Sequence, residues 1–142
     1  MNKKQLIADV RQWYARACEY DRAGFEKKAE PCYSKVYELG WRLLPEKERS
    51  GFFVGFGSTL RNNRNFKRSA DILTEGVRHF PHYPALNIFL ALTLRSSGKF
   101  KKAADVLFRS CLEMPDNSFD GYERAIKYYV SRLDERKPRR RK

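Results

Sequence analysis

Few residues of this 142-residue chain have the type and spacing that catalysis requires. Its three cysteines, Cys18, Cys32 and Cys111, are far apart and form no C-x-x-C motif, and His79 and His82 are its two histidines. A zinc site or a disulfide scaffold needs closer or paired ligands, so we expect free thiols that are buried or half-buried. The chain also contains no Walker A loop, nucleophile elbow or H-E-x-x-H motif. We therefore expect a protein that is not an enzyme and holds no cofactor or metal.

The charge of the chain points to binding instead. Lys and Arg number 30 against 17 Asp and Glu, which gives a formal net charge of +13. Five of these charges lie in residues 137–142, which we expect to form a disordered basic tail. The remaining net charge of +8, on residues 1–136, still predicts an acidic partner: a protein segment, a nucleic acid or an anionic membrane surface.

Two stretches of the chain repeat each other with a period of 34 residues. Residues 50–83 align with residues 84–117 without gaps and share nine identical positions, among them the Phe66/Phe100 and Pro81/Pro115 pairs. Within each unit the apolar residues recur at helical spacing on both sides of a polar turn, which is Asn62 to Asn65 in the first unit. Each unit is therefore predicted to be a helix-turn-helix.

Both ends of the repeat array can be extended by weaker matches. A degenerate unit begins at about Val10, although the segment from Gly40 to Arg49 is about six residues longer than the period allows. Beyond Pro115, the sequence from about 118 to 135 is amphipathic and predicts one further helix, which would cover the last apolar surface. The expected domain is thus residues 1–136, with repeats at about 10–49, 50–83 and 84–117 and a capping helix at about 118–135.

These units resemble the tetratricopeptide repeat, which also has a period of 34 residues. Its small, turn and closing positions are held here by matching residues: Gly57 and Ala91, Gly98 before Phe100, Ser69 and Ala103, and Pro81 and Pro115. In the second unit, Arg64 stands where the turn glycine would be and Ser69 replaces the alanine. The resemblance implies an all-α, right-handed superhelical solenoid that binds protein partners.

A finer resemblance comes from three phrases of the sequence. Residues 57–62, 89–92 and 122–129 are similar to those of a group of small bacterial tetratricopeptide proteins of about this length. That group has no established activity, so the similarity implies a bacterial protein of the same fold and adds nothing about its partner.

Stacked repeats of this kind have a concave groove lined by the first helix of each unit. The repeat register places Arg11, Cys18, Asp21, Gly51 and Ala85 on that face. We expect a partner to be bound there by these residues: Tyr14, Arg22, Val54, Ser58, Arg61, Ile88, Leu92, Arg95, Tyr122 and Tyr129. Arginine forks bind carboxylates, so the row of arginines predicts an acidic or amphipathic peptide. Alternatively, Arg61 and Arg95 only stabilise the last turns of their own helices.

A basic pair also begins the second helix of each unit, in the same two columns. The six residues, here called the basic ridge, are Lys27, Lys28, Lys67, Arg68, Lys101 and Lys102. Cations at a helix N-terminus oppose the helix dipole, so local helix stability does not explain them. The ridge suits a phosphate backbone, an acidic protein or an anionic membrane.

The sequence as a whole predicts a scaffold or adaptor that binds an acidic or amphipathic protein segment in its groove. The alternative is a nucleic-acid-associated protein that uses the basic ridge and the basic tail. No apolar stretch reaches the roughly 20 residues that span a bilayer, and the N-terminus has no signal-peptide pattern, so we expect a cytoplasmic protein.

Overall fold

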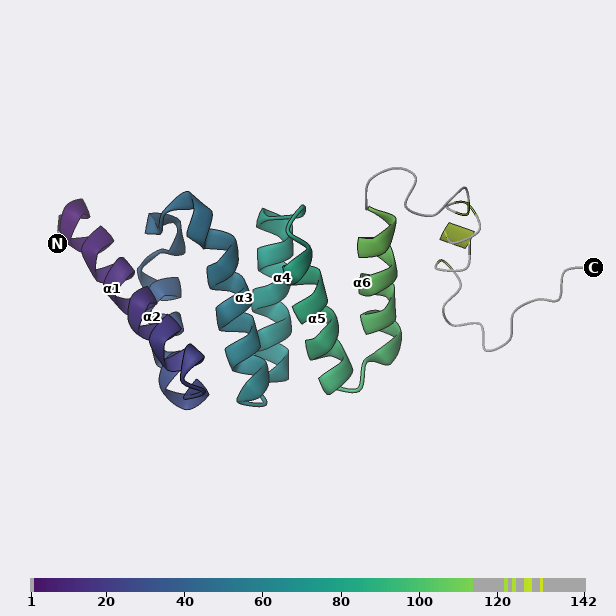
Figure 1. The fold of residues 1–142 in the computed structure, drawn as a ribbon, viewed down its shortest axis with the longest axis horizontal. Coiled ribbons are helices and arrows are strands. Elements are labelled where there is room, and N and C mark those ends of the chain that lie inside the picture. Colours follow the sequence, from purple (N-terminus) through teal and green to yellow (C-terminus); the bar gives the residue numbers. More distant parts are fainter. Residues whose placement is uncertain (1, 114–121, 123, 125–126, 129–130, 132–142) are drawn as a thin grey trace, which may run out of the picture.

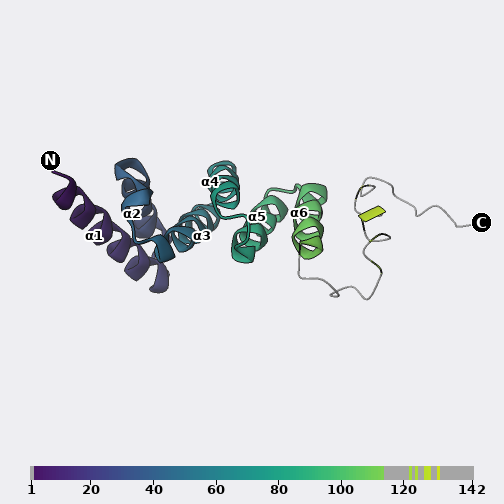
Figure 2. The same ribbon diagram turned by 90° about the horizontal axis from the view of Figure 1, so that it is seen from above.

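The computed structural model describes residues 2–113, 122, 124, 127–128 and 131. Its helices are α1 (Lys3–Arg22), α2 (Glu26–Leu39), α3 (Glu46–Asn62), α4 (Phe66–His79), α5 (Pro84–Ser96) and α6 (Phe100–Leu112), with a short 3-10 helix, η1 (Trp41–Leu43), before α3. Figure 1 shows them side by side in chain order, and Figure 2 shows that α1, α3 and α5 form one row with α2 and α4 behind it. This arrangement confirms the predicted helical solenoid.

The three turns inside the repeat units have the same geometry. The residue at the centre of each turn has a positive φ, which is 79° at Gly24, 66° at Arg64 and 80° at Gly98. The next residue then donates its N–H to the carbonyl five residues earlier: Phe25 to Tyr20, Asn65 to Leu60 and Lys99 to Leu94, at 2.8–2.9 Å. These bonds satisfy carbonyls at the helix C-termini, which explains why one turn structure recurs despite different sequences.

Local signals fix where the helices begin. The side chain of Asn2 accepts a hydrogen bond from the N–H of Gln5 and caps α1, while Asn65 caps α4 through the N–H of Arg68. Proline occupies the residue before α3 and the first position of α5, where its missing N–H costs no helical hydrogen bond.

The extra six residues between the first two units are also accounted for. The α2–α3 connection has six residues and contains η1, whereas the α4–α5 connection has four, and α3 has 17 residues against 13 in α5. The insertion thus adds two residues to the connection and about one turn to α3. The first helix is also longer than the repeat predicts, because α1 begins at Lys3 and the first repeat was expected from about Val10.

The core lies between the two rows of helices and depends on close contact at small residues. A methyl group added at Gly57 would overlap the side chain of Leu73, and one at Gly76 would lie 2.8 Å from the Cβ of Phe53. Aromatic rings fill the first half of the core: Tyr33 stacks on Phe56 with 5.9 Å between ring centroids. The small residues therefore set the distance between α3 and α4, and the large ones fill the space that remains.

Several sequence predictions fall on residues that the structure does not describe. The predicted capping helix lies almost entirely outside the described residues, as do Tyr129, the basic tail and the end of the third repeat. The domain boundaries accordingly stay predictions. In the part of the chain that is described, no helix is long and apolar enough to cross a membrane.

Candidate binding groove

Apart from Tyr122 and Tyr129, the residues predicted to line the groove lie on α1, α3 and α5, the face that we call the candidate groove. On α1, Tyr14, Cys18 and Asp21 are half-buried, and Arg11 and Arg22 are exposed. All four residues on α3 are half-buried: Gly51, Val54, Ser58 and Arg61. On α5, Ala85 is half-buried, and Ile88, Leu92 and Arg95 are exposed. Their neighbours in sequence, such as Phe53 and Leu90, are buried. Tyr14 and Val54 also pack against the core, and a partner's contact with the predicted groove residues remains a prediction.

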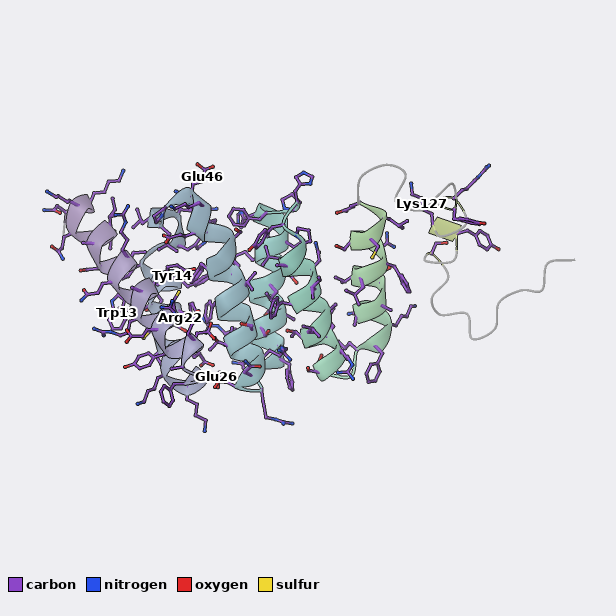
Figure 3. The ribbon with its side chains drawn as sticks, in the orientation of Figure 1. Trp13, Tyr14, Arg22, Glu26, Glu46 and Lys127 are labelled. Atoms are coloured by element: carbon purple, nitrogen blue, oxygen red, sulfur yellow. The ribbon has the colours of Figure 1, made fainter. Side chains whose placement is uncertain are left out.

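A cavity of about 490 Å³ opens at the α1 end of this groove. It is lined by residues of α1 and of the segment that leads into α3: Arg11, Tyr14, Ala15, Cys18, Arg22, Leu44, Pro45, Lys47 and Glu48. Figure 3 shows Tyr14 and Arg22 on the part of α1 that lies toward α3. Three cationic side chains and one carboxylate line the cavity, so its charge favours an anionic group.

About half of the residues that line this cavity were not predicted from the sequence. Leu44, Pro45, Lys47 and Glu48 belong to the six-residue insertion, for which the repeat register has no column. In the sequence, the only indication of this part of the cavity is the extra length of the segment between Gly40 and Arg49. This insertion into the 34-residue period marks the place where the first unit differs in shape from the others.

A polar contact joins the first two helices next to Cys18 and Arg22 of the cavity. The hydroxyl of Tyr33, on α2, donates a hydrogen bond of 2.7 Å to Oδ2 of Asp21, on α1. Gly55 makes room for this hydroxyl, because a methyl group there would lie 2.5 Å from it. The later units have Leu73 and Leu107 in the column of Tyr33, so this polar contact is specific to the first unit.

The phenol and thiol groups beside the cavity are neutral. Burial is the main cause that raises the pKa of Tyr14 and of Tyr33 well above the ordinary value near 10, and it also raises the pKa of the Cys18 thiol. A neutral phenol can donate a hydrogen bond to an anion, and a thiol with a raised pKa is a poor nucleophile. These side chains therefore suit binding better than covalent chemistry.

Arg61, at the middle of the groove, has a donor without an acceptor. Its Nε is buried and has no hydrogen-bond partner among the described residues. An unsatisfied buried donor on a charged group is costly, at about 1–3 kcal/mol or more. Arg61 therefore has an unsatisfied donor at this point of the groove, and a ligand reaches it only if the guanidinium group turns outward.

The α5 end of the groove differs in chemistry from the α1 end. Ile88 and Leu92, one helical turn apart, are 47% and 37% exposed, and the guanidinium group of Arg95 follows them. Tyr122, which was predicted to extend the floor of the groove, is 66% exposed. The groove thus passes from a cationic cavity at α1 to an apolar strip at α5.

The basic ridge occupies the positions that the sequence predicts. Its three pairs are the second and third residues of α2, α4 and α6, and all six side chains are exposed. They lie at the end of the helices where the chain turns within each unit, away from the α1 cavity at the start of α3.

Comparison with known families agrees with the fold. Residues 11–133 match a family model described as the Tetratrico peptide repeat. A search of curated proteins finds no match to this chain.

Proposed function

Because the chain belongs to the tetratricopeptide repeat family, we propose that it binds an acidic, amphipathic segment of a partner protein in the groove of α1, α3 and α5. Repeats of this family generally mediate protein–protein interactions, and stacked helix pairs provide the extended surface that such binding needs. The finer assignment, an acidic and partly apolar partner, is our inference from the chemistry of the groove.

The observation that carries this proposal is the buried, unpartnered Nε of Arg61. Once the guanidinium group turns toward the groove, a carboxylate of a bound segment would accept this hydrogen and the neighbouring ones of the guanidinium fork. The gain from such a bond is largest where the protein has already removed the donor from water. The alternative, in which Arg61 only stabilises the last turn of α3, leaves the Nε unsatisfied.

The rest of the groove supports the same kind of ligand. The cationic cavity beside Tyr14 would bind a second acidic group, and Ile88 and Leu92 would contact apolar side chains. A single segment that spans the groove must therefore carry acidic residues at one end and aliphatic or aromatic residues at the other. Both an extended peptide and an amphipathic helix can present such an arrangement.

Selection from a phage-displayed library of random 16-residue peptides tests the proposal. The full chain should enrich peptides with a net negative charge and a group of apolar residues. The double variant Arg22→Glu/Arg61→Glu should lose this enrichment, because it places carboxylates where the ligand's carboxylates would be bound.

The matched control is Lys35→Glu/Arg78→Glu, which has the same change of net charge on α2 and α4. It should enrich the same peptides as the unaltered chain. Enrichment of peptides without acidic residues, or equal loss in both double variants, would show that the groove does not select its ligand in the proposed way.

A further inference from the structure

The three turns within the repeat units lie at the same edge of the solenoid. Figure 1 shows the α1–α2, α3–α4 and α5–α6 turns together at the lower edge, and Figure 3 shows Glu26 at this edge and Glu46 at the opposite one. We call residues 22–28, 62–68 and 96–102 the turn edge. Each segment runs from the last residue of one helix to the third residue of the next.

Charge is concentrated at the turn edge. Its three segments contain nine basic residues and one acid, Glu26, a net charge of +8. The corresponding segments at the opposite edge, residues 39–48 and 79–86, contain two basic and two acidic residues. Because both edges belong to the same basic chain, its overall composition alone does not explain this asymmetry.

The turn edge also exposes two large apolar side chains. Phe25 is 54% exposed and Phe100 is 66% exposed, more than any other large apolar side chain of residues 2–113. Phe25 directly precedes α2 and Phe100 begins α6, so each stands beside a basic pair of the ridge. Exposed phenylalanines among cations are typical of surfaces that enter the interface of a membrane.

Cations already cover two aromatic rings of the turn edge, those of Phe25 and Phe66. The Nζ of Lys28 lies 5.2 Å from the ring centroid of Phe25, and the Cζ of Arg64 lies 5.9 Å from that of Phe66. A cation over the ring face competes with a nucleobase for the same position. These two rings are therefore less suited to stacking on bases than to contact with lipid through their edges.

Arg64 adds a charge to this edge at a conformational cost. Its φ of 66° is in the left-handed region, where the equivalent turn residues of the other units are Gly24 and Gly98. A non-glycine residue is uncommon in this conformation. The second unit thus carries a cation at a position that local backbone preference assigns to glycine.

We propose that the turn edge binds an anionic membrane surface. In this arrangement Phe25 and Phe100 enter the headgroup region, and the basic residues between them contact lipid phosphates and carboxylates. The groove lies on the row of α1, α3 and α5 and remains free, so the protein would bring a bound partner to the membrane. Arg22 is assigned to both surfaces, whereas the exposed phenylalanines and the basic ridge lie outside the groove residues, so either binding activity can be present without the other.

Co-sedimentation of the full chain with vesicles tests this proposal. The expected result is binding to vesicles of phosphatidylcholine with 30% phosphatidylserine, and none to pure phosphatidylcholine. The double variant Phe25→Ala/Phe100→Ala keeps the net charge and should bind about tenfold more weakly, because it removes the apolar contact alone. Circular dichroism checks that this variant keeps its helix content, as expected for two exposed residues.

A matched pair of charge variants separates the turn edge from net charge. Lys27→Glu/Lys67→Glu/Lys101→Glu should lower vesicle binding about a hundredfold. The variant Arg139→Glu/Arg140→Glu/Arg141→Glu changes the net charge by the same amount. It should lower vesicle binding by no more than about tenfold. Equal losses in the two triple variants would overturn the proposal.

Nucleic acid is the competing ligand for this surface. A 30-base-pair duplex and a 20-nucleotide single strand are titrated into the full chain at the same ionic strength as the vesicles. If the turn-edge triple variant loses nucleic-acid binding while Phe25→Ala/Phe100→Ala leaves vesicle binding unchanged, the edge is a phosphate-backbone site and the membrane proposal is wrong.

Discussion

The hydroxyl groups of Ser69 and Thr93 lie 2.9 Å apart, fully buried between the second and third repeat units. Ser69 also donates a hydrogen bond of 2.7 Å to the carbonyl of Gly57, so α3, α4 and α5 are joined by one chain of polar contacts. Because Ser69 uses its hydrogen on Gly57, Thr93 is the donor between the two hydroxyls.

The equivalent contact is missing between the first and second units. Thr59 stands one period before Thr93 and is also fully buried, but its hydroxyl has no partner among the described residues. By the repeat register, Ala29 occupies the position of Ser69 in the first unit. A methyl group there offers no acceptor, which explains why Thr59 is unsatisfied.

Two threonine-to-valine variants should therefore have opposite effects. Thr93→Val removes a hydrogen bond and is expected to lower the free energy of unfolding by about 1 kcal/mol. Thr59→Val removes a buried hydroxyl that makes no bond and is expected to raise it by about 1 kcal/mol. Urea denaturation followed by circular dichroism measures both. Destabilisation by Thr59→Val as large as that by Thr93→Val would show that Thr59 has a partner.

Arg64 provides a prediction about the turn of the second unit. Arg64→Gly should raise the free energy of unfolding by up to about 1 kcal/mol, because glycine adopts a φ of 66° without the steric conflict of a side chain. Gly98→Ala is the reverse change at the equivalent position and should destabilise, although nothing lies within 4 Å of the added methyl group. If the urea midpoints of the two variants shift in the same direction, the results contradict this explanation.

Two glycines of α3 should respond differently to alanine. Gly57→Ala is expected to lower the free energy of unfolding by about 1–3 kcal/mol, because its methyl group would overlap Leu73. Gly51→Ala should raise it by up to about 1 kcal/mol, because alanine favours a helix and its methyl group would meet only the Tyr14 hydroxyl at 3.6 Å. Thermal melts of the two variants, run in parallel, measure the difference.

The stability of the protein should fall in alkaline solution. Burial raises the pKa of Tyr14 in the folded state, so above about pH 10 the unfolded chain releases this proton while the folded chain keeps it. The unfolded state then binds fewer protons, and the free energy of unfolding decreases as pH rises, by up to about 1.4 kcal/mol per pH unit for one group. Tyr14→Phe should make this decrease less steep in urea titrations between pH 9 and 11.5. Identical slopes in the two proteins would contradict the assignment.

The fold could be predicted from the sequence because each repeat unit places the same residue types in the same environment. The small residues at Gly57 and Ala91 and the matching phenylalanines Phe66 and Phe100 mark helix contacts and helix starts that the structure contains. Arg64, which stands where the second unit would have the turn glycine, has the positive φ of the equivalent glycines. Periodicity works here because adjacent units pack by a common rule.

The cavity and the polar contact beside it could not be predicted in the same way. Lys47 and Glu48 lie in the insertion, and the Tyr33–Asp21 hydrogen bond joins two columns that hold leucine and arginine in the later units. Such features depend on residues that differ in one unit, and a repeat alignment shows only what the units have in common. The unpartnered Nε of Arg61 also depends on burial, which one sequence column does not specify.

The most direct test of the groove assignment is the affinity of an acidic peptide, selected by the unaltered chain, for single variants at Arg61. Isothermal titration should show that Arg61→Gln weakens binding by about tenfold or more, as the loss of a charge-assisted hydrogen bond predicts. Arg61→Lys, which keeps the charge but lacks the Nε donor, should recover little of this loss, and Arg78→Gln on α4 should change the affinity less than twofold. Equal affinities for the unaltered chain and Arg61→Gln would contradict the account.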